Sequence, residues 1–146
     1  MSIVNINYQG RVVDPHFIFS PTSSHPLQQI IKTSKCTLII FQSKKCRLMG
    51  CKEQISTLND FPYRIIIDKI QSATAILTLN KSINLMKLSQ KARCIYEKEL
   101  FPALRLTNFN PICVNVFSSG KIVIAGLKSL NTTGIIIKIK DEIYNE

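Results

Sequence analysis

The sequence has no apolar run that approaches the about 20 residues needed to span a bilayer. Its first residues also lack the charged stretch followed by an apolar stretch that marks a secretory signal. We therefore expect an intracellular, soluble protein. With 146 residues and 45% apolar side chains, the chain suits a single domain over 1–146 with a buried core.

The features of catalytic and metal sites are equally sparse. The five cysteines are odd in number and form no Cys-x-x-Cys pair, so we expect buried, reduced thiols. His16 and His25 have no Cys or carboxylate partner at a recognisable spacing, and there is no glycine-rich phosphate loop. We therefore expect no enzyme activity, no catalytic residue, no metal ion, no cofactor and no small-molecule substrate.

Acidic residues are few. Nineteen Lys and Arg stand against nine Asp and Glu, which gives a formal charge of +10. A balance of this sign favours a polyanionic partner, such as nucleic acid or an anionic membrane. Charge alone does not choose between these partners or exclude a simple effect on solubility; the residues considered below lead us to expect DNA and no membrane.

An internal repeat is the most informative feature that is present. CTLIIFQSKKCRLMGCK (36–52) and ICVNVFSSGKIVIAGLK (112–128) align without a gap, so that Phe41 falls on Phe117 at an offset of 76 residues. The same offset carries Pro26 onto Pro102. The chain therefore reads as two copies of one unit, about 1–66 and about 67–146.

Each aligned block predicts an antiparallel β-hairpin, because two alternating stretches rich in Val, Ile and Phe flank a turn. Side chains alternate between the faces of a strand, so each hairpin has an aliphatic face and a less apolar face with a Phe at its tip. The aliphatic faces hold Leu38, Ile40, Cys46, Leu48, Ile112, Val114, Val116, Ile122 and Ile124. The other faces hold Thr37, Ile39, Phe41, Arg47, Met49, Cys113, Asn115, Phe117, Val123 and Ala125.

The rest of each copy supplies two further strands and unequal helices. Strands are predicted at 3–13, 26–32, 70–79 and 102–107, which makes about eight in all. Amphipathic spacing predicts helices over 85–100 and in NTTGIIIKIKDEIYNE (131–146), although IIIKIK would also suit a strand. The first copy has room for only a turn or two of helix, at 52–61.

YEKELFPAL (96–104), NVFSSGKIVIAGLK (115–128) and the repeated layout resemble the second half of the TATA-box-binding protein family. The resemblance implies an α+β saddle in which two pseudo-symmetric repeats form one curved antiparallel sheet, with helices on its convex side. Members of this family bind the minor groove of DNA and kink it by roughly 80°, a value that belongs to the family and not to this sequence.

The resemblance also implies which residues meet DNA. Phe101 and Phe117 match the family's inserting phenylalanines in the second copy, Phe41 matches one in the first copy, and the fourth position falls on or next to His25. The family's strand asparagine corresponds to Ser72, with Ser2 or Asn5 as candidates in the first copy. The remaining residues assigned to the minor-groove face are Ile39, Arg47, Met49, Thr74, Asn115, Val123 and Ala125.

Basic residues complete the implied site. Arg47 departs from the small apolar or threonine side chain expected at its position, and an arginine there would be attracted to a narrow A·T-rich groove. The residues that match phosphate contacts, or share the face of Phe101, are Lys45, Lys52, Arg105, Lys121 and Lys128.

These residues lead to a first hypothesis: a transcription-initiation factor that recognises A·T-rich double-stranded DNA and acts with an initiation factor or an RNA polymerase subunit. It would work in the nucleus or at a viral transcription site, because the compact form suits a virus-encoded or fast-evolving member. Two alternatives stay open. The saddle could serve as a protein-interaction subunit with weak or no DNA binding, or as an accessory DNA-binding domain of a nucleic-acid enzyme.

Overall fold

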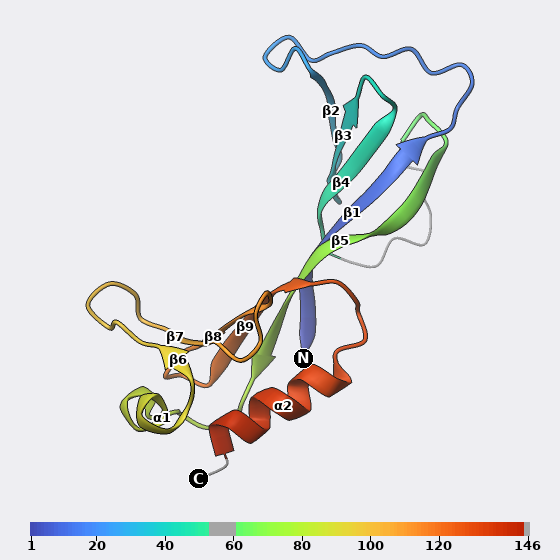
Figure 1. Cartoon of the computed structure of the whole chain (residues 1–146). Coiled ribbons are helices and arrows are strands. Elements are labelled where there is room, and N and C mark those ends of the chain that lie inside the picture. The colour runs from blue at the N-terminus through green and yellow to red at the C-terminus, as the bar shows by residue number, and fades with distance from the viewer. Residues whose placement is uncertain (53–60, 145–146) are drawn as a thin grey trace. The chain divides into compact units, whose positions relative to one another are not determined.

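The computed structural model describes residues 1–52 and 61–144 of the chain. These residues form one sheet of nine strands, in the order β2-β3-β4-β1-β5-β9-β8-β7-β6, and two helices (Figure 1). The elements are β1 (Ser2–Val12), β2 (Gln28–Lys32), β3 (Thr37–Phe41), β4 (Lys45–Cys51), β5 (Ile65–Thr78), α1 (Leu85–Lys91), β6 (Cys94–Ile95), β7 (Leu104–Leu106), β8 (Cys113–Val116), β9 (Lys121–Leu127) and α2 (Thr133–Tyr144). The helical turn predicted at 52–61 lies, for residues 53–60, outside the described residues.

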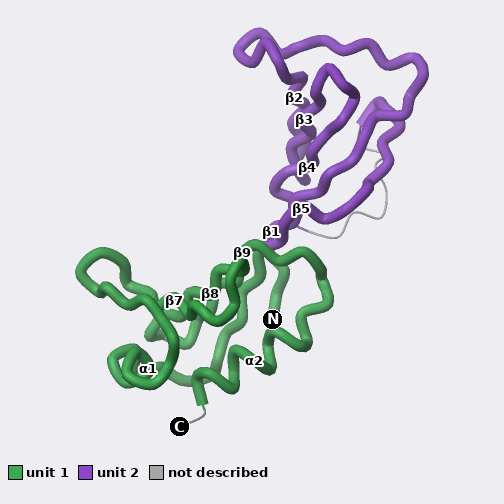
Figure 2. The backbone as a smooth tube through the Cα atoms, in the orientation of Figure 1, with its two compact units in different colours: residues 1–3, 74–146 green, residues 4–73 purple. Residues whose placement is uncertain are grey.

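The chain divides into two compact units (Figure 2). Unit 1 comprises Met1–Ile3 and Thr74–Glu146, and unit 2 comprises Val4–Ala73. β1 and β5 each contribute residues to both units. Both described helices belong to unit 1, so the uneven helical cover predicted from the sequence holds for the described part of the chain.

In unit 2, strands β2, β3, β4 and β1 pair antiparallel with their neighbours. The alternation predicted for the hairpin is confirmed, because one set of side chains is buried and the other is partly or fully exposed. Each aliphatic side chain of the buried set contributes about 1.5–3 kcal/mol to folding through the area it removes from water. The buried set is Leu38, Ile40, Cys46 and Leu48.

The segment before β2 helps to close the core of unit 2. Gln29 is buried on β2, where its Oε1 accepts a hydrogen bond from the Ser20 backbone N–H at 2.9 Å and its Nε2 donates to the Tyr63 hydroxyl at 3.1 Å. The buried Phe17 ring meets Tyr63 edge to face at a centroid distance of 4.8 Å. A buried amide is tolerated here because both of its ends have partners.

In unit 1, β9, β8, β7 and β6 pair in antiparallel order, and both helices bury residues. The face prediction is confirmed again, since Val114, Val116, Ile122 and Ile124 are fully buried. The predicted C-terminal helix is also confirmed as α2, which buries Ile139 and Ile143. Neither helix of the described residues is long and apolar enough to cross a membrane.

The helix predicted over 85–100 is wrong in its second half, because α1 ends at Lys91 and Ala92 is extended. The backbone beyond it hydrogen-bonds to the sheet instead: Cys94 and Ile95 pair with β7 as the extra strand β6. A short turn follows, in which the Phe101 N–H donates to the Glu97 carbonyl at 3.0 Å. The amphipathic spacing continues to Ile95, but residues 94 and 95 pair with the sheet instead of extending the helix.

The turns that end the two hairpins share one geometry. In unit 2 the Lys44 N–H donates to the Phe41 carbonyl at 2.8 Å, and in unit 1 the Gly120 N–H donates to the Phe117 carbonyl at 3.0 Å. Lys44 has φ 71° and Gly120 has φ 94°, so both residues adopt the left-handed backbone conformation. The repeat seen in the sequence is therefore a repeat of backbone conformation, and each turn fixes the Phe before it.

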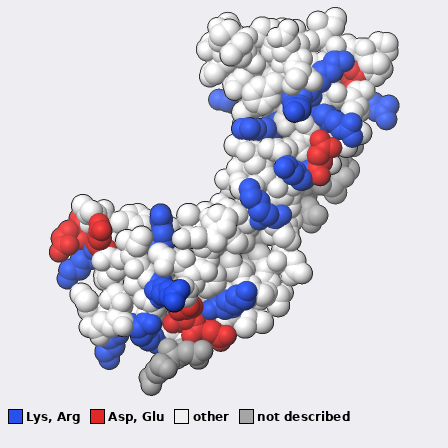
Figure 3. All heavy atoms as spheres, in the orientation of Figure 1, with Lys and Arg blue, Asp and Glu red and all other residues white. Residues whose placement is uncertain are grey.

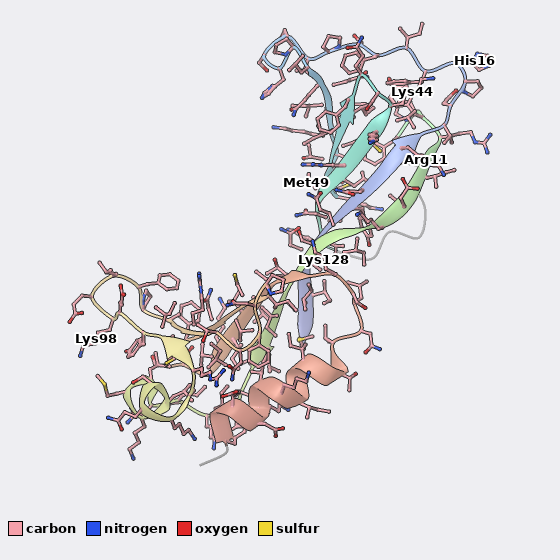
Figure 4. The ribbon with its side chains drawn as sticks, viewed as in Figure 1. Arg11, His16, Lys44, Met49, Lys98 and Lys128 are labelled. Atoms are coloured by element: carbon pink, nitrogen blue, oxygen red, sulfur yellow. The ribbon has the colours of Figure 1, made fainter. Side chains whose placement is uncertain are left out.

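We expect replacement of Lys44, which is labelled in Figure 4, by glycine to stabilise unit 2, because Lys44 has a positive φ that favours glycine. Relief of the left-handed strain, about 1–2 kcal/mol, exceeds the added chain entropy of glycine, about 0.5–1 kcal/mol. The net gain of about 0.5–1 kcal/mol should raise the urea midpoint. Gln42→Gly, in the same turn but without positive φ, should lower it, and equal shifts for both variants would contradict this account.

The cysteines are only partly as predicted. Cys36, Cys46 and Cys51 are buried free thiols, whereas Cys94 and Cys113 are half-buried. Burial, with a smaller effect of Asp68, raises the pKa of Cys46 to about 11. Burial and the hydrogen bond with Cys36 raise the pKa of Cys51 to about 12. These two thiols stay protonated at neutral pH, which makes them poor nucleophiles.

Candidate nucleic-acid interface

Each unit has one sheet face whose side chains are half-buried or exposed, opposite the face that carries its buried aliphatic side chains, and we call the former the open face. The open face of unit 1 is Thr74, Arg105, Cys113, Asn115, Phe117, Val123 and Ala125. The open face of unit 2 is Gln9, Arg11, Ile39, Phe41, Lys45, Arg47, Met49 and Ser72. Strand register brings residues of these sets directly opposite one another, as in the pairs Asn115–Val123 and Ile39–Arg47.

Phe101 and Phe117 form a ring pair in unit 1. Their centroids lie 6.2 Å apart with an interplanar angle of 66°. Phe101 is 48% exposed although it is large and apolar. The turn after β6 presents Phe101, and the turn between β8 and β9 presents Phe117. Two segments of unit 1 therefore bring two phenylalanine rings to one place.

Arg105 and Asn115 lie side by side on the same face. They are opposite each other on β7 and β8, and Arg105 Nε donates to Asn115 Oδ1 at 3.5 Å. The contact is at the long limit for a hydrogen bond, so it is weak. This hydrogen bond joins Arg105, a predicted phosphate contact, to Asn115, a predicted contact in the minor groove.

Unit 2 combines its hairpin Phe with an arginine. The Arg47 guanidinium lies 5.8 Å from the centroid of the Phe41 ring, within the range of a cation–π interaction. Arg47 is also opposite Ile39 on β3 and Gln9 on β1. The predicted contact residues Ile39, Phe41 and Arg47 are thus brought together around one exposed guanidinium.

Strand register bears on the fourth predicted inserting position. Gln29 pairs with Ile40 in unit 2, and Leu104 pairs with Val116 in unit 1. The hairpins correspond at an offset of 76 residues, but β2 and β7 correspond at an offset of 75. If this register is continued three residues back from Leu104, Phe101 corresponds to Pro26, next to His25; the inserting residue of unit 2 stays a prediction.

His25 itself lies in a short turn. Its backbone N–H donates to the Thr22 carbonyl at 2.8 Å, and its Nδ1 is 2.9 Å from Ser24 Oγ. The side chain is exposed. Its role as an inserting residue stays a prediction.

The predicted phosphate-binding lysines occupy matching places in the two hairpins. Lys45 and Lys121 open β4 and β9, and Lys52 and Lys128 follow the ends of these strands. All four side chains are exposed. Figure 3 shows Lys and Arg side chains over both units, while Asp and Glu side chains gather in a few places. The exposed charge of both units is therefore mainly positive in this view.

Asn7 was not among the residues predicted from the sequence. Its Oδ1 accepts the Gly50 N–H at 2.9 Å, and its Nδ2 donates to Ser72 Oγ at 3.3 Å, so one amide joins β4 to β5. Asn7 and Gln9 alternate with the buried Ile6 and Tyr8 along β1. This alternation could have placed Asn7 on the open face. Among the described residues, no hydrogen bond reaches the buried Oδ1 of Asn5, the other asparagine of this strand.

Comparison with known proteins identifies the class. Residues 68–140 match the family model described as transcription factor TFIID, or TATA-binding protein. The TATA-box-binding protein of Methanococcus aeolicus is 29% identical over 155 residues, covering 96% of this chain and 85% of its own. That of Methanococcus maripaludis is 30% identical over 139 residues, covering 86% and 76%.

A solved structure gives the same answer for the fold. The protein titled Methanococcus jannaschii TBP matches with a TM-score of 0.78 at 27% identity, covering 99% of this chain and 98% of its own. The predicted fold class is thereby confirmed: this is a two-repeat α+β protein with one open antiparallel sheet. The chain belongs to the TATA-box-binding protein family. These relatives are archaeal and give no support to a viral source.

Proposed function

We propose that the chain is a promoter-recognition factor for transcription initiation, which binds A·T-rich duplex DNA through the minor groove and kinks it. The observation that carries the proposal is the ring pair of the exposed Phe101 and the half-buried Phe117 at an open sheet face, in a member of this family. Apolar side chains inserted between base steps unstack them and bend the duplex toward the major groove.

The neighbouring side chains support this function. Val123 and Ala125 are small and half-exposed, so the sheet can approach the floor of a groove closely there. Thr74 and Ser72 on β5 add short polar side chains. Exposed lysines at the hairpin ends supply contacts to phosphates, which give affinity without reading sequence.

A protein partner from the transcription machinery, such as an initiation factor or polymerase subunit, forms the second part of the proposal. Leu100 and Ile18 are large apolar side chains that are 78% and 81% exposed. These two side chains, one in each unit, are the positions at which we would first test contact with such a partner. A saddle that binds only such a partner is the alternative function.

The test is fluorescence anisotropy of the purified chain with a short A·T-rich duplex and a G·C-rich duplex of equal length, across a salt series. Energy transfer between dyes on the duplex ends reports bending. We expect tighter binding to the A·T-rich duplex, strong salt dependence and shorter end-to-end distance in the complex. Binding that is absent, or equal for both duplexes and straight, would favour the protein-docking alternative.

The salt series also tests the lysines. In Lys121→Gln we expect the slope of log K against log salt to fall by about 0.9, the value for one phosphate contact on duplex DNA. Lys140→Gln is the matched control, since this lysine is equally exposed but lies on α2 and not on the open face of the sheet. A slope that changes equally in both variants would show that only net charge matters.

A further inference from the structure

Two thiols meet at one end of the β3–β4 hairpin in unit 2. The side chains of Cys36 and Cys51 are both buried and are joined by a hydrogen bond. Thiols that point toward each other can be bridged by a disulfide bond, whereas side chains that point apart cannot be bridged without movement of the backbone. The pair lies outside the proposed DNA contacts, because neither side chain is on the open face.

A bulge in β4 brings Cys51 to this place. Strict alternation from the buried Leu48 would put Cys51 on the open face. The pairing of β4 with β1 instead shifts by one residue between Leu48 and Cys51, and Gly50 within this bulge has φ 74°. An added residue of this kind re-aims the side chain that follows it. Cys51 is therefore turned inward and is only 2% exposed.

A tight turn holds the backbone of Cys36. This residue ends the turn between β2 and β3, in which the Thr33 N–H donates to the Cys36 carbonyl at 2.9 Å. The Cys36 N–H donates to Thr33 Oγ1 at 3.2 Å, and the Thr33 hydroxyl donates to the Cys36 carbonyl at 3.1 Å. Cys36 is 8% exposed, more than Cys51, so it is the thiol that a small reagent from solution meets first.

The second repeat has the same bulge without the thiols. At the offset of 76 residues, Ile112 takes the place of Cys36 and Leu127 takes the place of Cys51. Gly126 has φ 85°, as Gly50 does in its own bulge at 74°, and Leu127 is buried. An aliphatic side chain therefore fills the position of Cys51 in unit 1, so packing at such a bulge does not require a thiol.

We propose that Cys36 and Cys51 are a thiol modification site, at which a hydroperoxide forms a reversible disulfide bond. First, the Cys36 thiolate attacks one peroxide oxygen and the O–O bond breaks, which leaves a sulfenic acid on Cys36 and releases the other oxygen, protonated, as water or an alcohol. Next, the Cys51 sulfur attacks the Cys36 sulfur, the S–O bond breaks, and hydroxide leaves with the Cys51 proton as water. The two sulfurs together lose two electrons, and the peroxide takes both.

The order of the steps follows from burial. Burial, with the hydrogen bond from Cys36, raises the pKa of Cys51 to about 12, so Cys51 stays protonated at neutral pH and reacts second. A dithiol reverses the bond by thiol–disulfide exchange. The bond closes a loop over residues 36–51, which contains the whole β3–β4 hairpin. Closing this loop restricts the unfolded chain and so stabilises unit 2.

The experiment treats the folded, reduced full chain with hydrogen peroxide, blocks the remaining thiols and identifies linked peptides by mass spectrometry. Trypsin cuts after Lys45 and Arg47, so the three cysteines of unit 2 fall on separate peptides. We expect one linked pair, Cys36 with Cys51, which has lost two hydrogen atoms and is released by dithiothreitol. The chain oxidised in urea should give mixed pairings. The same mixture from the folded chain, or oxidation that leaves Cys36 and Cys51 unlinked, would overturn the proposal.

Urea unfolding gives a second readout. Oxidation should raise the midpoint of the wild type, and dithiothreitol should restore it. Cys36→Ala should abolish this shift, whereas Cys113→Ala, which removes a half-buried thiol from unit 1, should keep it. A shift of equal size in Cys36→Ala would show that another reaction stabilises the protein. If Cys36→Ala does not fold, the peptide map of the wild type decides the proposal alone.

Discussion

Replacing Phe101 and Phe117 together by alanine should abolish the bend in the A·T-rich duplex and weaken binding by at least about tenfold. Each ring removes apolar area from water when it enters a base step, and its loss costs about 1.5–3 kcal/mol. The rings contact each other, so the double variant removes the wedge as one unit. End-labelled energy transfer measures the bend, and anisotropy measures the affinity.

Phe109→Ala provides a matched control for this variant. Phe109 belongs to the same unit but lines a hollow beside α2 together with Ile135 and Asp141, among other residues. Its loss should leave the bend unchanged. A double variant that still bends the duplex as the wild type does, while remaining folded by circular dichroism, would exclude Phe101 and Phe117 as the wedge.

Gly120→Ala should destabilise the protein by at least about 2 kcal/mol. Gly120 has φ 94°, and a Cβ built there would lie 2.5 Å from the Lys81 carbonyl oxygen and 2.8 Å from that of Leu79. These are backbone atoms that cannot turn away as a side chain would. The turn is also fixed by hydrogen bonds, since the Leu79 N–H donates to the Gly120 carbonyl at 2.9 Å.

Urea unfolding followed by circular dichroism measures the loss in Gly120→Ala, as a fall in the midpoint. Gly134→Ala is the control, because Gly134 lies in α2 with open space where its Cβ would be. Alanine there should stabilise the helix by about 0.5–1 kcal/mol. If both variants lost stability alike, the clash at the hairpin turn would not be the cause.

Much of the fold could be predicted because the hairpins carry strong alternation. Leu38, Ile40, Ile122 and Ile124 are all fully buried, as their strand positions require. The repeat at one offset then fixed the correspondence of Phe41 and Phe117, and the structure gives these residues the same turn geometry. Local pattern and tertiary burial agree wherever a strand has one covered face.

Other features depended on tertiary contacts that no local pattern shows. The sequence from 92 to 95 continues the helical spacing, but sheet pairing of Cys94 and Ile95 outweighs a weak helix preference. The one-residue difference between β2 and β7 was hidden because Pro26 and Pro102 align so well in sequence. Gln29 reads as a surface residue until its partners Ser20 and Tyr63 are known.

For the candidate site, the sequence predicted which residues share a face better than which residues touch. The contact of Arg47 with Phe41 and the bond of Arg105 to Asn115 both join residues named in advance. Asn7 was missed because its role appears only when β4 and β5 are both in place. Binding and bending of DNA by these residues stay predictions.

The way in which β1 and β5 belong to both compact units constrains how this protein could have evolved. Residues 1–3 group with 74–146, although they are joined in sequence to the other unit. Loss of either gene half would therefore remove part of a strand from the half that remained. The two units differ in surface chemistry, as Arg47 and Phe101 illustrate, and yet they share two strands, so a cut between residues 73 and 74 would divide β5.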